Sequence, residues 1–127
     1  MAYENPTYVS YNFGIYDFGA ASEALEINGP SGKKGRVYDV HVAATETFNE
    51  VTTPAYVRVG SATTADEFAE LDLGSTADAD ALSATNQTGA LKAVNIDADE
   101  AVKVAFVAPT GGTPAGMGYV TIVIGWF

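Results

Sequence analysis

His41 is the only histidine of the chain, and it stands two residues after Asp39 in a segment of alternating polarity. Residues two apart on a β-strand point to the same face, and an Asp–His pair can orient a general base, as it does in hydrolase triads. However, the chain has no cysteine, and no serine stands in a Gly-x-Ser-x-Gly turn. We therefore expect Asp39 and His41 to be a solvated or hydrogen-bonded strand pair, and we predict no catalytic residue and no enzyme activity.

Two short acidic segments, at 78–80 and 97–100, could supply oxygen ligands to calcium, a cation that favours clustered carboxylates. An EF-hand loop beginning at Asn95 fails. Its sixth position would be Glu100, where glycine is needed, and its twelfth would be Phe106, where a bidentate glutamate is needed. We therefore predict solvated turn carboxylates and no metal site, with a calcium site of another kind between loops as the alternative.

The glycine-rich segment 111–118 and the basic cluster of Lys33, Lys34 and Arg36 are the two candidates for phosphate binding. The glycine-rich segment lacks the Gly-Lys-Ser/Thr ending of a phosphate loop, and a strand rather than a helix follows it. We interpret it as a mobile hairpin loop between the last two strands, whose tip is a natural contact site. The basic cluster is expected to keep a turn solvated in an acidic molecule. No cofactor is predicted.

The charge balance excludes two classes of partner. Six basic residues against sixteen acidic ones give a net charge of −10, which argues against nucleic acid and anionic membranes, since both are bound through Lys and Arg. No apolar stretch reaches the roughly 18 residues of a membrane helix. No basic and then apolar leader is visible, so we expect a protein that is made in the cytoplasm and has no membrane partner.

Apolar residues recur at every second position through most of the 127-residue chain, which is the period of a half-buried strand. Strands are expected at 11–18, 25–27, 36–46, 55–60, 69–73, 101–108 and 119–127. Turns rich in Gly, Pro, Asn and Thr separate them, and helical signal is confined to single turns near 65–70 and 78–84. The pattern predicts an all-β, single-domain antiparallel β-sandwich, jelly-roll-like, with at most short helical turns.

Three details of this sandwich are also expected. The strand at 25–27 would pair back as a hairpin with the strand at 36–46. Within the latter, alternation places one set of side chains on a common face: Arg36, Tyr38, Val40, Val42 and Ala44. The last strand is apolar on both faces, so it is predicted to be central and covered on both sides.

Tyrosines concentrate at the start of the chain. Tyr3, Tyr8 and Tyr11 lie within residues 1–12, where little alternation is present before Tyr11. Because tyrosine offers a large contact area at low entropic cost, we assign residues 1–12 to an N-terminal arm that contacts a partner, ahead of a β-sandwich domain over 13–127. The alternative is that these residues pack on their own domain as an edge strand.

Four segments resemble small virion proteins of tailed bacteriophages: 35–42, 47–48, 53–60 and the ending 116–127, with its glycine-rich loop, β-branched strand and final Trp-Phe. The resemblance implies a capsid decoration (cement) protein, a jelly-roll-like sandwich on the head surface that bridges subunits of the major capsid protein. Such a protein would be a homo-oligomer, a trimer or a dimer, with no catalytic residues. Tyr3, Tyr8 and Tyr11 of the arm are then the expected capsid contacts.

Two other classes stay open. A carbohydrate- or receptor-binding β-sandwich of a phage head or tail fibre would use an exposed aromatic platform, such as Tyr56 or Tyr119, with carboxylates for the hydroxyl groups of its ligand. A small hydrolase would need a pair of carboxylates in a cleft. The acidic residues of this chain stand mostly in turns, which makes the hydrolase the least favoured class.

Overall fold

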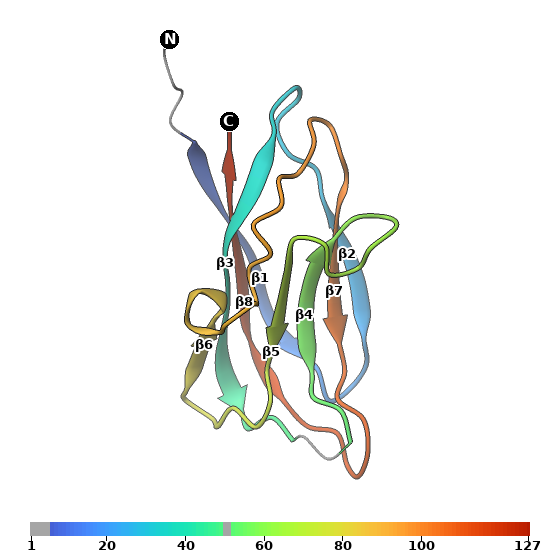
Figure 1. The fold of residues 1–127 in the computed structure, drawn as a ribbon. Helices are drawn as coiled ribbons and strands as arrows, with labels where there is room; N and C mark the ends of the chain where they lie inside the picture. The colour runs from blue at the N-terminus through green and yellow to red at the C-terminus, as the bar shows by residue number, and fades with distance from the viewer. Residues whose placement is uncertain (1–5, 50–51) are drawn as a thin grey trace.

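The structure is a computed structural model, and it describes residues 6–49 and 52–127. In this part of the chain eight strands follow one another, and one short 3₁₀ turn, η1 (Ala84–Asn86), is the only helix. The strands are β1 (Thr7–Asp17), β2 (Glu23–Ile27), β3 (Gly35–Glu46), β4 (Tyr56–Gly60), β5 (Ala69–Asp72), β6 (Ala81–Ser83), β7 (Val102–Val107) and β8 (Met117–Trp126). The predicted all-β class is confirmed (Figure 1).

The strands form two antiparallel four-stranded sheets, one in the order β1-β8-β3-β6 and the other in the order β2-β7-β4-β5. Strand β1 pairs with β8, β2 with β7, β3 with β6 and β4 with β5. The chain is therefore one long hairpin of paired strands that wraps across both sheets, as Figure 1 shows. This strand order is that of an eight-stranded jelly roll, and it confirms the predicted antiparallel sandwich.

The core lies between the two sheets and is built from the inward positions of each strand. Its fully buried members include Val40, Val42, Val57, Leu71, Phe106, Ile122 and Ile124. Near one end the ring of Phe18 packs 5.3 Å from that of Phe48 and 5.6 Å from that of Phe106. At the other end the Trp126 indole lies so close to Gly29 and Gly35 that a Cβ there would come within 2.3 and 2.6 Å of it. Glycine is required at both positions.

The positions of β3, β4, β5, β7 and β8 are confirmed to within two residues of the expected bounds. Strand β6 was not expected, because three residues are too few to show a period. The expected helical turns do not form a helix. Near 65–70 there is one turn, in which the Glu67 N–H donates to the Thr64 carbonyl, and the 78–84 segment passes instead into β6.

The hairpin expected between 25–27 and 36–46 is wrong. Strand β2 pairs with β7, whereas β3 pairs with β8 and β6, so the two consecutive strands lie in different sheets. The same holds for β7 and β8, so the glycine-rich segment is a crossover and not a hairpin loop. Asn49 holds this crossover by donating its side-chain amide to the Thr113 carbonyl at 2.8 Å. A jelly roll pairs strands that are distant in sequence, which local turn signals do not report.

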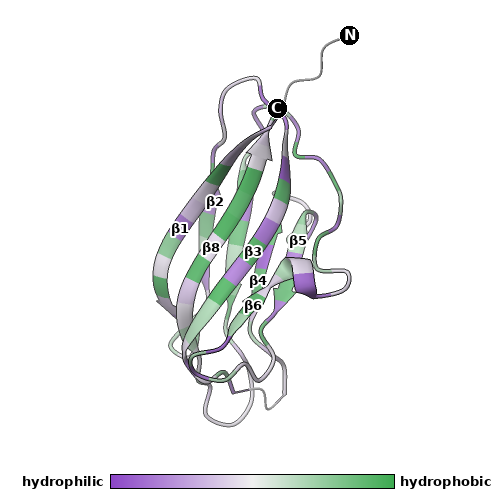
Figure 2. Ribbon diagram, turned by 90° about the vertical axis from the view of Figure 1, so that its left-hand side faces the viewer, coloured by the Kyte–Doolittle hydropathy of each residue, from purple (hydrophilic) through white to green (hydrophobic). Residues whose placement is uncertain are grey.

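Two predictions about strand faces are also wrong. A register shift between Val37 and Asp39 in β3 turns Tyr38 outward, while Val37 joins Val40 inside. Such a bulge inserts one residue and so reverses the alternation. Strand β8 is central, as expected, but only one of its faces is covered: Tyr119, on the other face, is 51% exposed. In the described part of the chain no segment lies over that side of the sheet, which faces the viewer in Figure 2.

Strand β1 begins at Thr7, so residues 7–12 belong to the sheet, and the boundary placed after residue 12 falls inside a strand. Of the two alternatives for the tyrosine-rich start, the edge strand is the one that the structure has from Thr7 onward. Residues 1–5, with Tyr3, lie outside the described residues.

Candidate docking surface

Tyr8 and Tyr11, the two described tyrosines of the predicted contact set, lie on opposite faces of β1. Tyr8 is 57% exposed. Tyr11 faces inward, where its ring packs against the core and its hydroxyl accepts a hydrogen bond from Trp126 Nε1 at 2.9 Å. The structure therefore does not bring the two side chains together. Of the two, only Tyr8 is exposed to solvent.

Removing the Tyr11 hydroxyl tests its structural role. In a Tyr11→Phe variant the N–H of Trp126, a residue only 4% exposed, loses its acceptor, so the free energy of unfolding is expected to fall by about 1 kcal/mol. For a domain of this size that lowers the melting temperature by roughly 3–5 °C. Thermal unfolding followed by circular dichroism measures it, with Tyr119→Phe as the matched control, because Tyr119 is 51% exposed. A Tyr11→Phe variant that melts with the wild type would contradict the assignment.

The outer side of the sheet β1-β8-β3-β6, which we call the outer face, carries most of the exposed large hydrophobic side chains of the described chain. They are Tyr8, Ile15, Tyr38 and Tyr119, with exposed fractions of 57%, 50%, 39% and 51%. Ile15 stands directly opposite Tyr119. Between the two aromatic ends runs one cross-strand row of polar residues: Asn12, Thr121, His41 and Ser83. The large apolar side chains therefore stand at the two ends of the outer face, with hydrogen-bonding groups between them.

Tyr8 and Tyr38 form a pair at one end of the outer face. Their ring centroids lie 4.7 Å apart and the rings meet edge to face, at 79°. A hydrogen bond with Tyr38 is the main cause that raises the pKa of Tyr8 above its ordinary value, and partial desolvation adds to it. The pair is thus pre-ordered, which lowers the entropic cost of using it in a contact.

The Tyr38→Phe variant is expected to bring the pKa of Tyr8 back toward its ordinary value of 10.0. Because the folded-state pKa of Tyr8 is raised, the interaction is present at neutral pH and is lost as the pH rises through that pKa. An NMR titration of labelled tyrosine measures the change. An unaltered Tyr8 titration in the variant would show that the two hydroxyls do not interact.

The opposite sheet presents a different surface, on which two ion pairs join neighbouring strands. Arg58 Nε donates to Glu70 Oε2 at 2.6 Å, and the same guanidinium lies 4.7 Å from the centre of the Tyr56 ring. Lys103 forms an ion pair with Glu26, and its hydrogen bond is the main cause that lowers the pKa of that carboxyl. Tyr56 is thus covered by Arg58, so of the two aromatic platforms that the sequence suggested, Tyr119 is the exposed one.

The structure places Ser83 beside the Asp39–His41 pair. His41 and Ser83 are directly opposite in the β3–β6 ladder, and the Ser83 hydroxyl donates to Asp39 Oδ1 at 2.7 Å. A catalytic triad needs the serine hydroxyl to donate to the histidine, and the histidine to donate to the carboxylate. The observed arrangement joins serine directly to aspartate, so it is a hydrogen-bonded strand cluster on the outer face. Sequence alone could not reveal Ser83, since β6 has no signal of its own.

The acidic 97–100 segment and the basic cluster lie in turns at the start of β3, whereas the 78–80 segment lies near its end, where the Ala79 N–H donates to the Ala44 carbonyl. Asp99 Oδ1 accepts the Gly32 N–H at 2.8 Å, and so ties the acidic 97–100 loop to the turn that precedes β3. Arg36 Nε donates to Asn95 Oδ1 at 2.9 Å. Within residues 6–49 and 52–127 no group of three or more acidic or histidine side chains is arranged to hold a metal ion.

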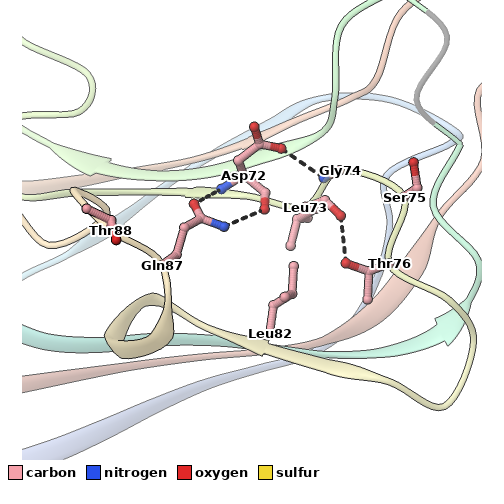
Figure 3. A pocket seen from close by; sticks show the side chains of 8 residues that line it. All are labelled: Asp72, Leu73, Gly74, Ser75, Thr76, Leu82, Gln87 and Thr88. Carbon is pink, nitrogen blue, oxygen red and sulfur yellow. Dashed lines mark hydrogen bonds between the residues drawn. The ribbon is translucent and has the colours of Figure 1, made fainter.

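An open hollow of about 590 Å³ lies at the sheet edge between β5 and β6 (Figure 3). It is lined by Asp72, Leu73, Gly74, Ser75, Thr76, Leu82, Gln87 and Thr88. The Gln87 amide accepts the Asp72 N–H at 2.9 Å and donates to the Asp72 carbonyl at 3.0 Å, while the Asp72 carboxylate accepts the Gly74 N–H at 2.8 Å. Since Asp72 is the only titratable residue of the lining, the hollow does not hold the carboxylate pair that a glycosidase needs.

Comparisons with protein-family models, with curated proteins and with solved structures found no match to this chain. Among the helices of the described residues, none has the length and apolar character to cross a membrane.

Proposed function

We propose that the protein is a non-enzymatic virion structural protein that decorates and stabilises a bacteriophage capsid by bridging subunits of the major capsid protein. It would lie on the capsid surface as a homo-oligomer, a trimer or a dimer, with the outer face against the shell. One observation carries the proposal: exposed aromatic and aliphatic side chains stand on one sheet face, whereas the opposite face carries two cross-strand ion pairs.

The chemistry of the outer face favours a protein partner. Tyrosine is enriched at protein interfaces and charged residues are depleted at their centres. The strand β8, which runs through the middle of this face, has no charged residue over its whole length. The jelly-roll order adds support by analogy, because viral capsid proteins use the same architecture, as do lectins.

The net charge of −10 suits a protein that is made in free form and then assembles. Like charges keep unassembled copies soluble and apart. Each docking contact can then be modest, because several linked copies on one shell raise the effective concentration of the remaining contacts.

Stabilisation of the shell is the property to test. Undecorated heads are mixed with the purified protein and heated, and DNA release is followed with a nuclease. We expect release to move to higher temperature in proportion to the amount of protein bound, until binding saturates. Heads that release DNA at the same temperature with and without bound protein would contradict the stabilising role.

A carbohydrate- or receptor-binding module is the second candidate, and the exposure of Tyr119 favours it, since a sugar ring stacks on an exposed aromatic side chain. In that case immobilised glycans would retain the wild-type protein, and Tyr119→Ala would abolish retention. Retention by undecorated heads without retention by any glycan would favour decoration.

A further inference from the structure

Each sheet of the sandwich has two edge strands, and an exposed edge is a template for pairing with another chain. The edge of β5 is covered: the Glu70 N–H donates to the Ala90 carbonyl, and Gln87 pairs with the backbone of Asp72. Strand β6 has only three residues. Strand β2 has five and carries Glu23 and Glu26, whose charges discourage pairing.

Strand β1 has none of these protections over most of its length. It has eleven residues, and the first charged one is Asp17, at its end. Figure 2 shows it at the margin of its sheet with no strand beyond it, and within the described chain its ladder is made with β8 alone. In an antiparallel ladder, alternate peptide groups of an edge strand point away from the neighbouring strand, so those of β1 are available to a partner.

The inward side of β1 is also incompletely covered. Val9, Tyr11 and Phe13 face the core yet are only half-buried, and Leu25 on the facing edge strand β2 is half-buried too. The seam between the two sheets is therefore apolar and open on this side. A strand added beside β1 would cover it.

Two residues limit the stretch that can pair. Pro6 precedes the strand and has no N–H to donate. Gly14, at φ +71°, follows a register shift that interrupts the regular ladder. That shift leaves Phe13 without a partner in the β1–β8 ladder, so the regular free edge between Pro6 and Gly14 is Thr7–Asn12.

We propose that two copies of the protein pair through their β1 strands, antiparallel and about a two-fold axis at Ser10. Tyr8 then lies opposite Asn12 of the second copy, Val9 opposite Tyr11, and Ser10 opposite Ser10. Outward residues meet outward residues and inward residues meet inward ones, as antiparallel pairing requires. Of the registers that satisfy this, the one centred on Ser10 pairs five regular residues, Tyr8–Asn12, and keeps Pro6, which has no N–H, away from them.

A second copy suits this edge better than a partner of different sequence, because the edge is complementary to itself. It carries no charge between Thr7 and Tyr16, so it adds no repulsion at the contact although each chain has a net charge of −10. In the dimer, the two β1-β8-β3-β6 sheets form one continuous eight-stranded sheet. The outer faces of both copies then lie on the same side of it. The inference holds whether or not that face binds a capsid.

Cysteine cross-linking tests both the dimer and its register, because the natural chain has no cysteine. Directly opposed residues in an antiparallel ladder have Cα atoms about 4.5 or 5.5 Å apart, within the range of a disulfide. Ser10→Cys is exposed and is expected to form an interchain disulfide rapidly with an oxidant such as copper phenanthroline. Asn12→Cys is the matched control on the same strand and face, since two copies of it would lie roughly 13 Å apart.

Light scattering of the wild-type protein comes first, and we expect the mass of a dimer. The Ser10→Cys variant should then cross-link at least tenfold faster than Asn12→Cys. A wild-type monomer at all accessible concentrations would overturn the proposal. So would a dimer or a higher oligomer whose two cysteine variants cross-link at the same rate, because its interface would lie elsewhere.

Discussion

The Phe106→Ala variant is expected to lose about 3–5 kcal/mol of unfolding free energy, the usual cost of emptying an aromatic site in a core. Phe106 is 1% exposed and packs against the rings of Phe13, Tyr16 and Phe18, with centroids 5.5, 4.9 and 5.6 Å away. It therefore joins β7 to β1 across the two sheets. The melting temperature should fall by roughly 10–20 °C.

Differential scanning calorimetry measures this loss, with Phe127→Ala as the matched control. Phe127 is 39% exposed, and its backbone rather than its ring is tied to Lys34. The control should change the unfolding free energy by no more than about 0.5 kcal/mol. If both variants melted alike, the position of Phe106 in the core would be wrong.

The second large effect concerns binding. The Tyr119→Glu variant is expected to weaken binding to undecorated capsids by about 30-fold or more, which is the loss of one interface hot spot of roughly 2 kcal/mol. The reason is that a carboxylate would replace an aromatic anchor and would have to be desolvated against the shell. Because Tyr119 is exposed and lies on the uncovered side of β8, the fold should be retained.

Ala105→Glu is the matched control for this loss. It adds the same charge to the outward side of the opposite sheet, where its directly opposed neighbour on β4 is Arg58. The proposal predicts unchanged capsid binding for this variant. Equal losses in the two variants would indicate that net charge, and not the outer face, governs binding.

The strand content and the sandwich could be predicted from sequence because each strand buries one face and the alternation records that face directly. The segment from Arg36 to Glu46 shows both the strength and the limit of this signal. Its strand is at the expected place, but a bulge after Val37 reverses the faces at Tyr38. A single inserted residue leaves no mark in composition, so the outward position of Tyr38 could not be predicted.

Only part of the candidate site could be predicted from the sequence. Tyr8 and Tyr11 are three positions apart, so they lie on opposite faces of a regular strand. A single strand over 7–17 would have predicted this separation, but polar residues interrupt the apolar alternation there. The partnership of Tyr8 with Tyr38, and that of Ile15 with Tyr119, depends on the β1-β8-β3 order. In a jelly roll the first strand pairs with the last one, and no local sequence signal encodes a pairing between strands so far apart in the chain.

Co-sedimentation of the wild-type protein with undecorated phage heads at ordinary salt tests the central claim most directly. The protein should pellet with the heads and saturate at a fixed number of copies per capsomer, and Tyr119→Glu should remain in the supernatant under the same conditions. A wild-type protein that stays in the supernatant at every concentration, or that pellets without saturating, would contradict the decoration role.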